Sequence, residues 1–162
     1  HLQARIEEHW AKQLQGRNWL AVHVRGSDKV HEIKHLHAVN EAYYGAIDQI
    51  LSVNPALSIF LLTDSVPMLQ CFQERYGDRI VTLDVIRSDT QTGVHYAGHS
   101  GKVVGEQVIL DAWLASRCEF FLGNGGSNVS VGIRHLKTWK PGTFFLLGED
   151  FLGQRNKVVH NW

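Results

Sequence analysis

The residues that could do chemistry gather first in a seven-residue stretch that runs from His23 to Lys29. It follows a short apolar run that predicts a buried strand, and side chains alternate along a strand. His23 and Arg25 therefore project to the same side, with Arg25 at the carboxyl end. A guanidinium there can hold a phosphate through two parallel hydrogen bonds. The alternative is that Arg25 pairs with Asp28 and that His23 is a hydrogen-bonded core residue.

A second polar cluster is glycine-rich and reads Gly123-Asn124-Gly125-Gly126-Ser127-Asn128. Glycines let the backbone approach a ligand, and the N–H groups of a following helix favour an anion. The dinucleotide-binding pattern G-x-G-x-x-G is absent, because Asn128 stands where its last glycine belongs. The cluster predicts an anion-binding turn, and a plain tight turn is the alternative.

A single carboxylate, Asp111, lies among apolar neighbours in the stretch Ile109-Leu110-Asp111-Ala112-Trp113. A buried carboxylate is costly without a partner. Asp111 should therefore meet a cation, a backbone donor or the N–H groups of a ligand. The alternative is that it occupies the solvent-exposed face of a helix.

Composition excludes several classes of partner. The 162 residues include 16 Lys and Arg against 16 Asp and Glu, so the formal net charge is zero. With no dense basic run, we expect neither nucleic acid nor membrane contact by this chain. Ten histidines show no zinc-binding spacing, so we expect no metal, and two cysteines, Cys71 and Cys118, are interpreted as buried thiols. With no signal peptide or apolar span, a cytoplasmic location is favoured.

Strands and helices are predicted to alternate along one domain that covers residues 1–162. Apolar runs predict strands over 19–24, 57–62, 80–85, 119–122 and 143–147. Apolar spacing predicts helices over 2–15, 38–53, 67–76, 103–116 and 129–136, with a long loop over 86–101. This order indicates an α/β fold with a doubly wound, Rossmann-like parallel sheet. Ligands of such sheets bind at the carboxyl ends of the strands, where residues 25–29, 63–65 and 123–128 are predicted to lie.

The motifs, in this order, resemble those of the alpha-1,6-fucosyltransferases, which include the nodulation fucosyltransferases. Residues 22–30 are similar to that family's H-V-R-R-T-D-K-V motif, and residues 60–64 to its apolar strand that ends in T-D. Residues 108–111 are identical to its V-I-L-D, and residues 127–129 fall near the spacing of its S-S-Q-V turn. The resemblance covers about residues 19–136.

This resemblance implies the C-terminal, donor-binding half of a GT-B glycosyltransferase. The reaction implied is metal-independent transfer of fucose, with inversion, from GDP-fucose to a glycan or other hydroxyl acceptor. The acceptor domain would lie in an N-terminal part of the same protein, and we expect this chain, which begins with His1, to be a piece of it.

The resemblance also implies roles for individual residues. Arg25 would hold the β-phosphate, His23 would contact the ribose and diphosphate, and Asp111 would accept hydrogen bonds from guanine. Asp28 belongs to the same motif and would therefore be part of the donor-binding site. The residues Gly125, Gly126, Ser127 and Asn128 would form the turn beside the diphosphate.

Two departures from the family pattern leave a second interpretation open. Gly26 stands where the family has a second arginine, and Ile33 stands where it has the glutamate that activates the acceptor. Glu32 is one residue earlier and is the candidate base, together with Arg25 and Lys29 as the catalytic set. The alternatives are a non-catalytic nucleotide-sugar-binding module or degenerate relative, and a structural α/β interaction domain.

Overall fold

Strands and helices alternate along the chain. The structure is a computed structural model, and it describes residues 1–26, 36–89, 100–149 and 155–160. Within these ranges the elements are α1 (Leu2–His9), a π-helical turn (Trp10–Leu14), β1 (Trp19–Val24), α2 (Leu36–Val53), β2 (Ser58–Thr63), α3 (Val66–Tyr76), a 3₁₀ turn (Gly77–Arg79), β3 (Ile80–Val81), α4 (Gly101–Arg117), β4 (Phe120–Asn124), α5 (Asn128–His135), β5 (Phe144–Glu149) and β6 (Arg155–His160).

The strands form one sheet in the order β3-β2-β1-β4-β5-β6. The five strands from β3 to β5 are parallel, which confirms the predicted doubly wound, Rossmann-like α/β fold. The last strand, β6, pairs antiparallel with β5 and was not predicted. Because β1 lies between β2 and β4, its carboxyl end lies in the middle of the sheet edge where ligands of such folds bind.

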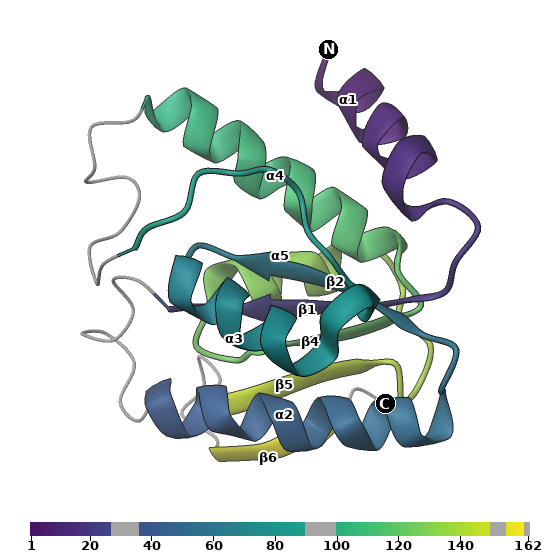
Figure 1. Cartoon of the computed structure of the whole chain (residues 1–162), viewed down its shortest axis with the longest axis vertical. Coiled ribbons are helices and arrows are strands. Elements are labelled where there is room, and N and C mark those ends of the chain that lie inside the picture. The colour runs from purple at the N-terminus through teal and green to yellow at the C-terminus, as the bar shows by residue number, and fades with distance from the viewer. Residues whose placement is uncertain (27–35, 90–99, 150–154, 161–162) are drawn as a thin grey trace.

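Helices cover both faces of the sheet (Figure 1). On one face, α1, α4 and α5 pack against a core that includes Trp19, Phe121 and Phe144. On the other face, α2 and α3 pack against a core that includes Tyr43 and Phe72. All six residues of β1 are buried, as expected for a central strand covered on both sides.

The third strand is shorter than predicted, with two residues in place of the six expected over 80–85. The chain leaves the sheet after Val81, and the side chain of Arg87 then supplies hydrogen-bond donors for backbone carbonyls of the segment 82–85. The Arg87 guanidinium donates to the carbonyls of Leu83 and Val85 and to Oγ1 of Thr82. Further along, the amide of Ser88 donates to the carbonyl of Asp64 at 2.8 Å. The segment therefore crosses beside the carboxyl end of β2.

A serine caps the start of α3. Ser65 occupies the N-cap position and its hydroxyl accepts from the amide of Met68, and a proline lies in the first turn. The cap fixes the place where β2 ends and the helix begins. The polar residues after β2 are thereby held next to the end of β1.

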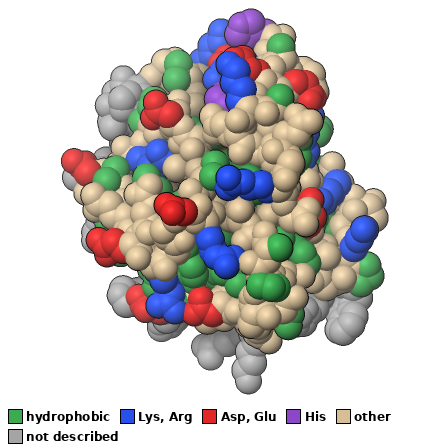
Figure 2. All heavy atoms as spheres, turned by 45° about the vertical axis from the view of Figure 1, so that its right-hand side comes forward, with side chains coloured by type: hydrophobic (Ala, Val, Ile, Leu, Met, Phe, Trp, Pro, Cys, Tyr) green, Lys and Arg blue, Asp and Glu red, His purple; other side chains and the backbone are tan. Residues whose placement is uncertain are grey.

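The cysteines, the surface charges and the helix lengths add three observations. Cys118 is buried as predicted, whereas Cys71 is exposed, so the prediction for Cys71 was wrong. On the face shown in Figure 2, acidic and basic side chains are interspersed with hydrophobic ones. Among the described residues, no helix is long and apolar enough to cross a membrane.

The contact between β4 and α5 generates a stability prediction. A Cβ added at Gly123 would lie 2.5 Å from Oγ of Ser130 and 2.6 Å from the ring of Phe121. We therefore expect Gly123→Ala to lower the free energy of unfolding by about 1–3 kcal/mol through overpacking. Urea denaturation measures this change.

Gly132 provides the matched control. It lies within α5, and a Cβ there would meet no atom within 4 Å. Gly132→Ala should raise the free energy of unfolding by about 0.5–1 kcal/mol, because alanine loses less backbone entropy in a helix. Equal effects of the two substitutions would contradict the close approach of β4 and α5.

Candidate functional site

A cleft opens at the carboxyl ends of β1 and β2, beneath α4. Its polar lining consists of His23, Arg25, Thr63, Asp64, Gln107 and Asp111, and apolar side chains of β2, α4, α5 and the segment after β3 complete it. We call it the strand-end cleft. It brings together three residues that the sequence singled out: His23, Arg25 and Asp111.

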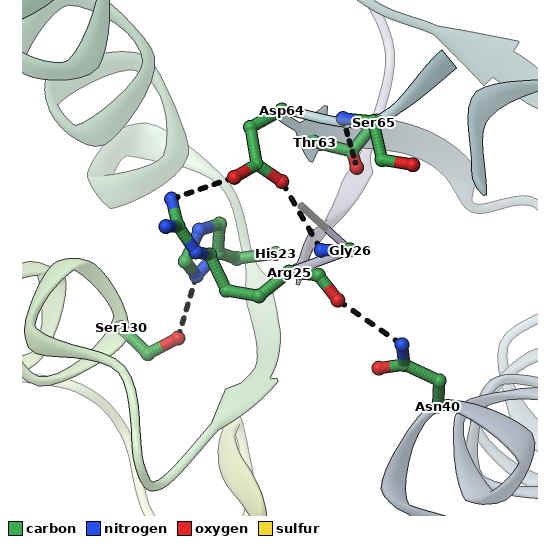
Figure 3. A network of polar contacts seen from close by, with 8 residues as sticks. All are labelled: His23, Arg25, Gly26, Asn40, Thr63, Asp64, Ser65 and Ser130. Carbon is green, nitrogen blue, oxygen red and sulfur yellow. Dashed lines mark hydrogen bonds and ion pairs between the residues drawn. The ribbon is translucent and has the colours of Figure 1, made fainter. Parts of the chain in front are cut away.

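Arg25 is held in the cleft by a carboxylate of the neighbouring strand end. Its guanidinium lies 3.0 Å from Oδ2 of Asp64, and both side chains are largely buried. The other carboxylate oxygen, Oδ1, accepts from the amide of Gly26 at 3.1 Å (Figure 3). One carboxylate thus fixes both the side chain of Arg25 and the backbone that follows it. The structure pairs Arg25 with Asp64, while Asp28, the partner expected in the alternative, lies outside the described residues.

His23 is buried beside Arg25 and carries no charge. Its Nδ1 lies 2.7 Å from the hydroxyl of Ser130 in α5. Burial, reinforced by the nearby Arg25 charge, lowers the pKa of His23 to about 3. The carbonyl of His23 accepts from the hydroxyl of Tyr43 at 2.6 Å, which anchors the strand end to α2. A neutral imidazole with a fixed ring is the result.

Asp111 faces the same cleft from the middle of α4. Burial raises the pKa of its carboxyl to about 7, and the positive charge of Arg87 opposes this shift. Among the described residues, none forms a hydrogen bond or ion pair with this carboxylate. A desolvated carboxylate without a bonded partner is unfavourable in the free protein. It can be satisfied by a ligand that brings N–H donors.

The glycine-rich turn lies between β4 and α5, next to the cleft. The amide of Gly125 donates to the carbonyl of Leu147 at 2.8 Å. The amide of Gly126 donates to Oδ1 of Asn124 at 2.8 Å. Ser127 is buried and Asn128 is exposed. Because both glycine amides have partners within the protein, the turn offers a ligand fewer backbone donors than its sequence predicts.

Contact between this turn and the cleft comes from the residues that follow it. Val129 lines the strand-end cleft, whereas Gly125, Gly126, Ser127 and Asn128 are not among its lining residues. Their predicted contact with a diphosphate therefore stays a prediction.

Three other predicted site residues, Asp28, Lys29 and Glu32, lie outside the described residues. Their predicted roles stay predictions. In the parts of the chain that the structure describes, no group of three or more His, Cys, Asp or Glu side chains is placed to hold a metal ion.

The structure adds two contacts in the site, made by Asp64 and by Ser130, that the sequence did not predict. Asp64 follows β2 in the polar stretch 63–65, and that position at a strand end was the available signal. In the sequence, Ser130 is the third residue of Asn128-Val129-Ser130, which fits the N-x-S pattern of a glycosylation motif and gives no sign of a contact with His23. Its side chain is completely buried and bonds a histidine from a strand early in the chain, a contact that sequence spacing does not reveal.

Comparison with known proteins identifies the fold. No protein-family model and no curated protein sequence matches the chain. Solved structures of the alpha-1,6-fucosyltransferase NodZ do match: one co-crystallized with GDP, with a TM-score of 0.61 and 16% identity, and one soaked with GDP-fucose, with a TM-score of 0.60 and 17% identity. A third, of NodZ from Bradyrhizobium, has a TM-score of 0.61 and 16% identity.

Each match covers 99% of this chain but only 46–48% of the NodZ chain. This chain therefore spans about half the length of those enzymes. At this level of identity the likeness shows a fucosyltransferase-like fold.

The carboxylate of Asp111, which has no bonded partner among the described residues, generates a prediction about stability and pH. Its pKa is about 7 in the folded protein against 3.8 for an ordinary carboxyl, so the folded state holds this proton more tightly than the unfolded chain. Through this group, stability falls as pH rises from about 4 to about 7. Asp111→Asn should therefore raise the free energy of unfolding at pH 8 by on the order of 2 kcal/mol and change it little at pH 4.

Urea denaturation at the two pH values measures this difference. Asp78→Asn, which removes an exposed carboxylate from the turn before β3, controls for the loss of one charge. A gain at pH 8 as large in Asp78→Asn as in Asp111→Asn would show that desolvation of Asp111 is not its cause.

Proposed function

We propose that this chain is the donor-binding part of a fucosyltransferase-like glycosyltransferase. It would bind GDP-fucose and take part in metal-independent transfer of fucose, with inversion, to a hydroxyl of a glycan or similar acceptor. The observation that carries the proposal is the strand-end cleft, which joins Arg25, a neutral His23 and the unpaired carboxylate of Asp111. The fucosyltransferase-like fold supports it, because solved structures with that fold were co-crystallized with GDP or soaked with GDP-fucose.

Asp111 is suited to a guanine base. Guanine offers an N1–H and an exocyclic amino group on one edge, and a carboxylate can accept both hydrogen bonds. The ionised form is required, since a protonated carboxyl loses acceptor capacity. The N–H donors of guanine would favour that form and lower the pKa of Asp111 from its raised value in the free protein.

Arg25 is suited to the diphosphate. In the proposed reaction an acceptor hydroxyl attacks the anomeric carbon of fucose while the bond from that carbon to the β-phosphate oxygen breaks. The electron pair leaves with GDP, and the guanidinium stabilises the negative charge that develops on the phosphate. Asp64 holds the guanidinium in place within the cleft before the donor arrives.

The acceptor side is a prediction that extends beyond this cleft. The hydroxyl proton of the acceptor must pass to a base, and Glu32, near Lys29, is the candidate that the sequence offers. An acceptor domain would complete the site from the part of the whole protein that corresponds to the other half of the NodZ chain.

A second candidate function, a nucleotide-sugar-binding module without turnover, is favoured by the surroundings of Gly26. A Cβ at this position would lie 2.7 Å from Cβ of Ser65 and 2.8 Å from Cγ of Met68. The packing therefore has no room for the second arginine of the family motif, and the site lacks that cation. The two candidates differ in turnover: only the enzyme, assayed as the whole gene product, would release GDP from GDP-fucose in the presence of an acceptor.

Nucleotide selectivity tests the proposed function directly. We expect the 162-residue chain to bind GDP more tightly than UDP or ADP, because Asp111 discriminates the guanine edge. Calorimetric titration with the three nucleotides measures the difference. Equal binding of all three, or binding of none, would contradict the assignment.

Arg25→Lys tests the diphosphate contact. Lysine keeps the positive charge beside Asp64 but loses the planar fork of the guanidinium. We expect affinity for GDP to fall roughly 10-fold or more, as for a charge-assisted hydrogen bond, while affinity for guanosine stays unchanged. Calorimetry with both ligands measures the two effects.

Arg75→Lys serves as the control, since Arg75 pairs with Asp48 at an exposed position on α3, away from the cleft. It should leave both affinities unchanged. If Arg25→Lys is folded and binds GDP as the natural chain does, Arg25 does not hold the diphosphate.

A further inference from the structure

The imidazole of His23 has its two nitrogens in different surroundings. Nδ1 lies 2.7 Å from Oγ of Ser130. The other nitrogen, Nε2, has no hydrogen-bond partner among the described residues, and His23 lines the strand-end cleft. Figure 3 shows Nε2 directed away from Ser130, on the side of the ring where the Arg25 guanidinium lies. The position of the ring proton therefore determines whether Nε2 of His23 offers the cleft a hydrogen-bond donor or an acceptor.

The hydroxyl of Ser130 determines where that proton is. A serine hydroxyl has one proton to donate and two lone pairs that accept. The backbone amide of Asn124 donates to Oγ of Ser130 at 3.1 Å, so this contact uses a lone pair. The contact with Nδ1 of His23 is the other hydrogen bond of this hydroxyl. Nδ1 is thus the acceptor to which the hydroxyl proton can go.

Burial leaves no alternative to this assignment of Nδ1 as the acceptor. Ser130 is completely buried and His23 is 5% exposed, so neither side chain can exchange its partner for bulk water. Buried hydroxyl groups nearly always make their hydrogen bonds. If Nδ1 of His23 carried the proton instead, Oγ of Ser130 would accept twice and its own proton would have no acceptor. That arrangement would leave a buried donor unsatisfied, which is costly.

The ring has only one proton to place. Burial and the charge of Arg25 keep the imidazole neutral, with its pKa lowered to about 3. With Nδ1 accepting from Ser130, the single ring proton is on Nε2.

We propose that Ser130 is a positioning residue that holds His23 as the Nε2–H tautomer, so that His23 presents a hydrogen-bond donor to the nucleotide diphosphate. The second half of this proposal rests on the proposed function. Glycine at position 123 makes the arrangement possible, because a Cβ there would collide with Oγ of Ser130.

This assignment separates two roles that a histidine in a transferase could have. A ring whose free nitrogen is protonated can donate to a phosphate oxygen but cannot take a proton from an acceptor hydroxyl. His23 would then act with Arg25 on the leaving diphosphate. Another residue must therefore receive the proton of the acceptor hydroxyl, and Glu32 is the predicted candidate.

Nitrogen-15 NMR of the free 162-residue chain tests the tautomer without any ligand. With the ring nitrogens labelled and His23 assigned by through-bond correlation, we expect Nε2 to show the shift of a protonated nitrogen and Nδ1 that of an unprotonated one at pH 7. A protonated Nδ1 in the natural chain would overturn the proposal. This measurement needs no variant and does not depend on nucleotide binding.

Ser130→Ala tests the link to Ser130 and the consequence for the donor. Without the hydroxyl, we expect the His23 spectrum to shift toward the Nδ1–H tautomer and the affinity for GDP to fall about 3- to 10-fold, with guanosine affinity unchanged. Ser116→Ala is the matched control. Ser116 is also a buried helical serine, but its hydroxyl donates to the carbonyl of Trp113 in its own helix. It should change neither the spectrum nor the affinity ratio.

The outcomes distinguish this proposal from the proposed function. An unchanged tautomer in Ser130→Ala, or equal losses for GDP and guanosine, would overturn the positioning role. If the natural chain shows the Nε2–H tautomer but binds no GDP, the tautomer assignment is supported, whereas the diphosphate contact and the proposed function are both overturned.

Discussion

The polar groups at the carboxyl end of β1 lie in the middle of a sheet covered on both faces, and this burial constrains the rest of the site. These groups are largely shielded from water, so the protein must supply most of their partners. Tyr43 and Asn40 of α2 donate to the carbonyls of His23 and Arg25. A serine of α5 bonds the imidazole, and Asp64 at the end of β2 bonds the guanidinium. The end of one strand thereby ties together elements from both helical layers.

This network orients some groups and leaves another unsatisfied. Arg25 and His23 have fixed partners, so they reach a ligand already oriented, and little conformational entropy remains to be lost on binding. Asp111 has no bonded partner among the described residues, and its raised pKa reflects the free-energy cost of burying the ionised carboxylate. A buried carboxylate with a raised pKa, in a cleft beside an arginine and a histidine, is typical of a functional site. The free protein is less stable for it, and in the proposed function the bound nucleotide would relieve this cost.

Local patterns predicted the fold, whereas long-range contacts set the parts of the site that the sequence did not reveal. The apolar run 19–24 and the helical spacing of 38–53 follow from periodicity and match β1 and α2 closely. The strand β6 reads Arg-Asn-Lys-Val-Val-His, which is too polar and short to be recognised without its partner β5. The buried contact between His23 and Ser130 joins residues far apart in sequence, and no spacing rule predicts such a pair. Arg25 was predicted to lie at the carboxyl end of its strand, where the structure places it, but its contact with Asp64 depends on the pairing of β1 with β2.

The departure at Gly26 is a property of the packing rather than of one residue. Its backbone lies against Ser65, which caps α3, and against Met68 in the first turn of that helix, while its amide donates to Asp64. A larger residue at position 26 would require the start of α3 to move, and this would disturb the carboxylate that holds Arg25. The loss of a cation and the close approach of α3 are therefore linked. With one arginine in place of two at the proposed diphosphate site, the orientation of Arg25 and the proposed donor character of His23 would carry more of the phosphate recognition.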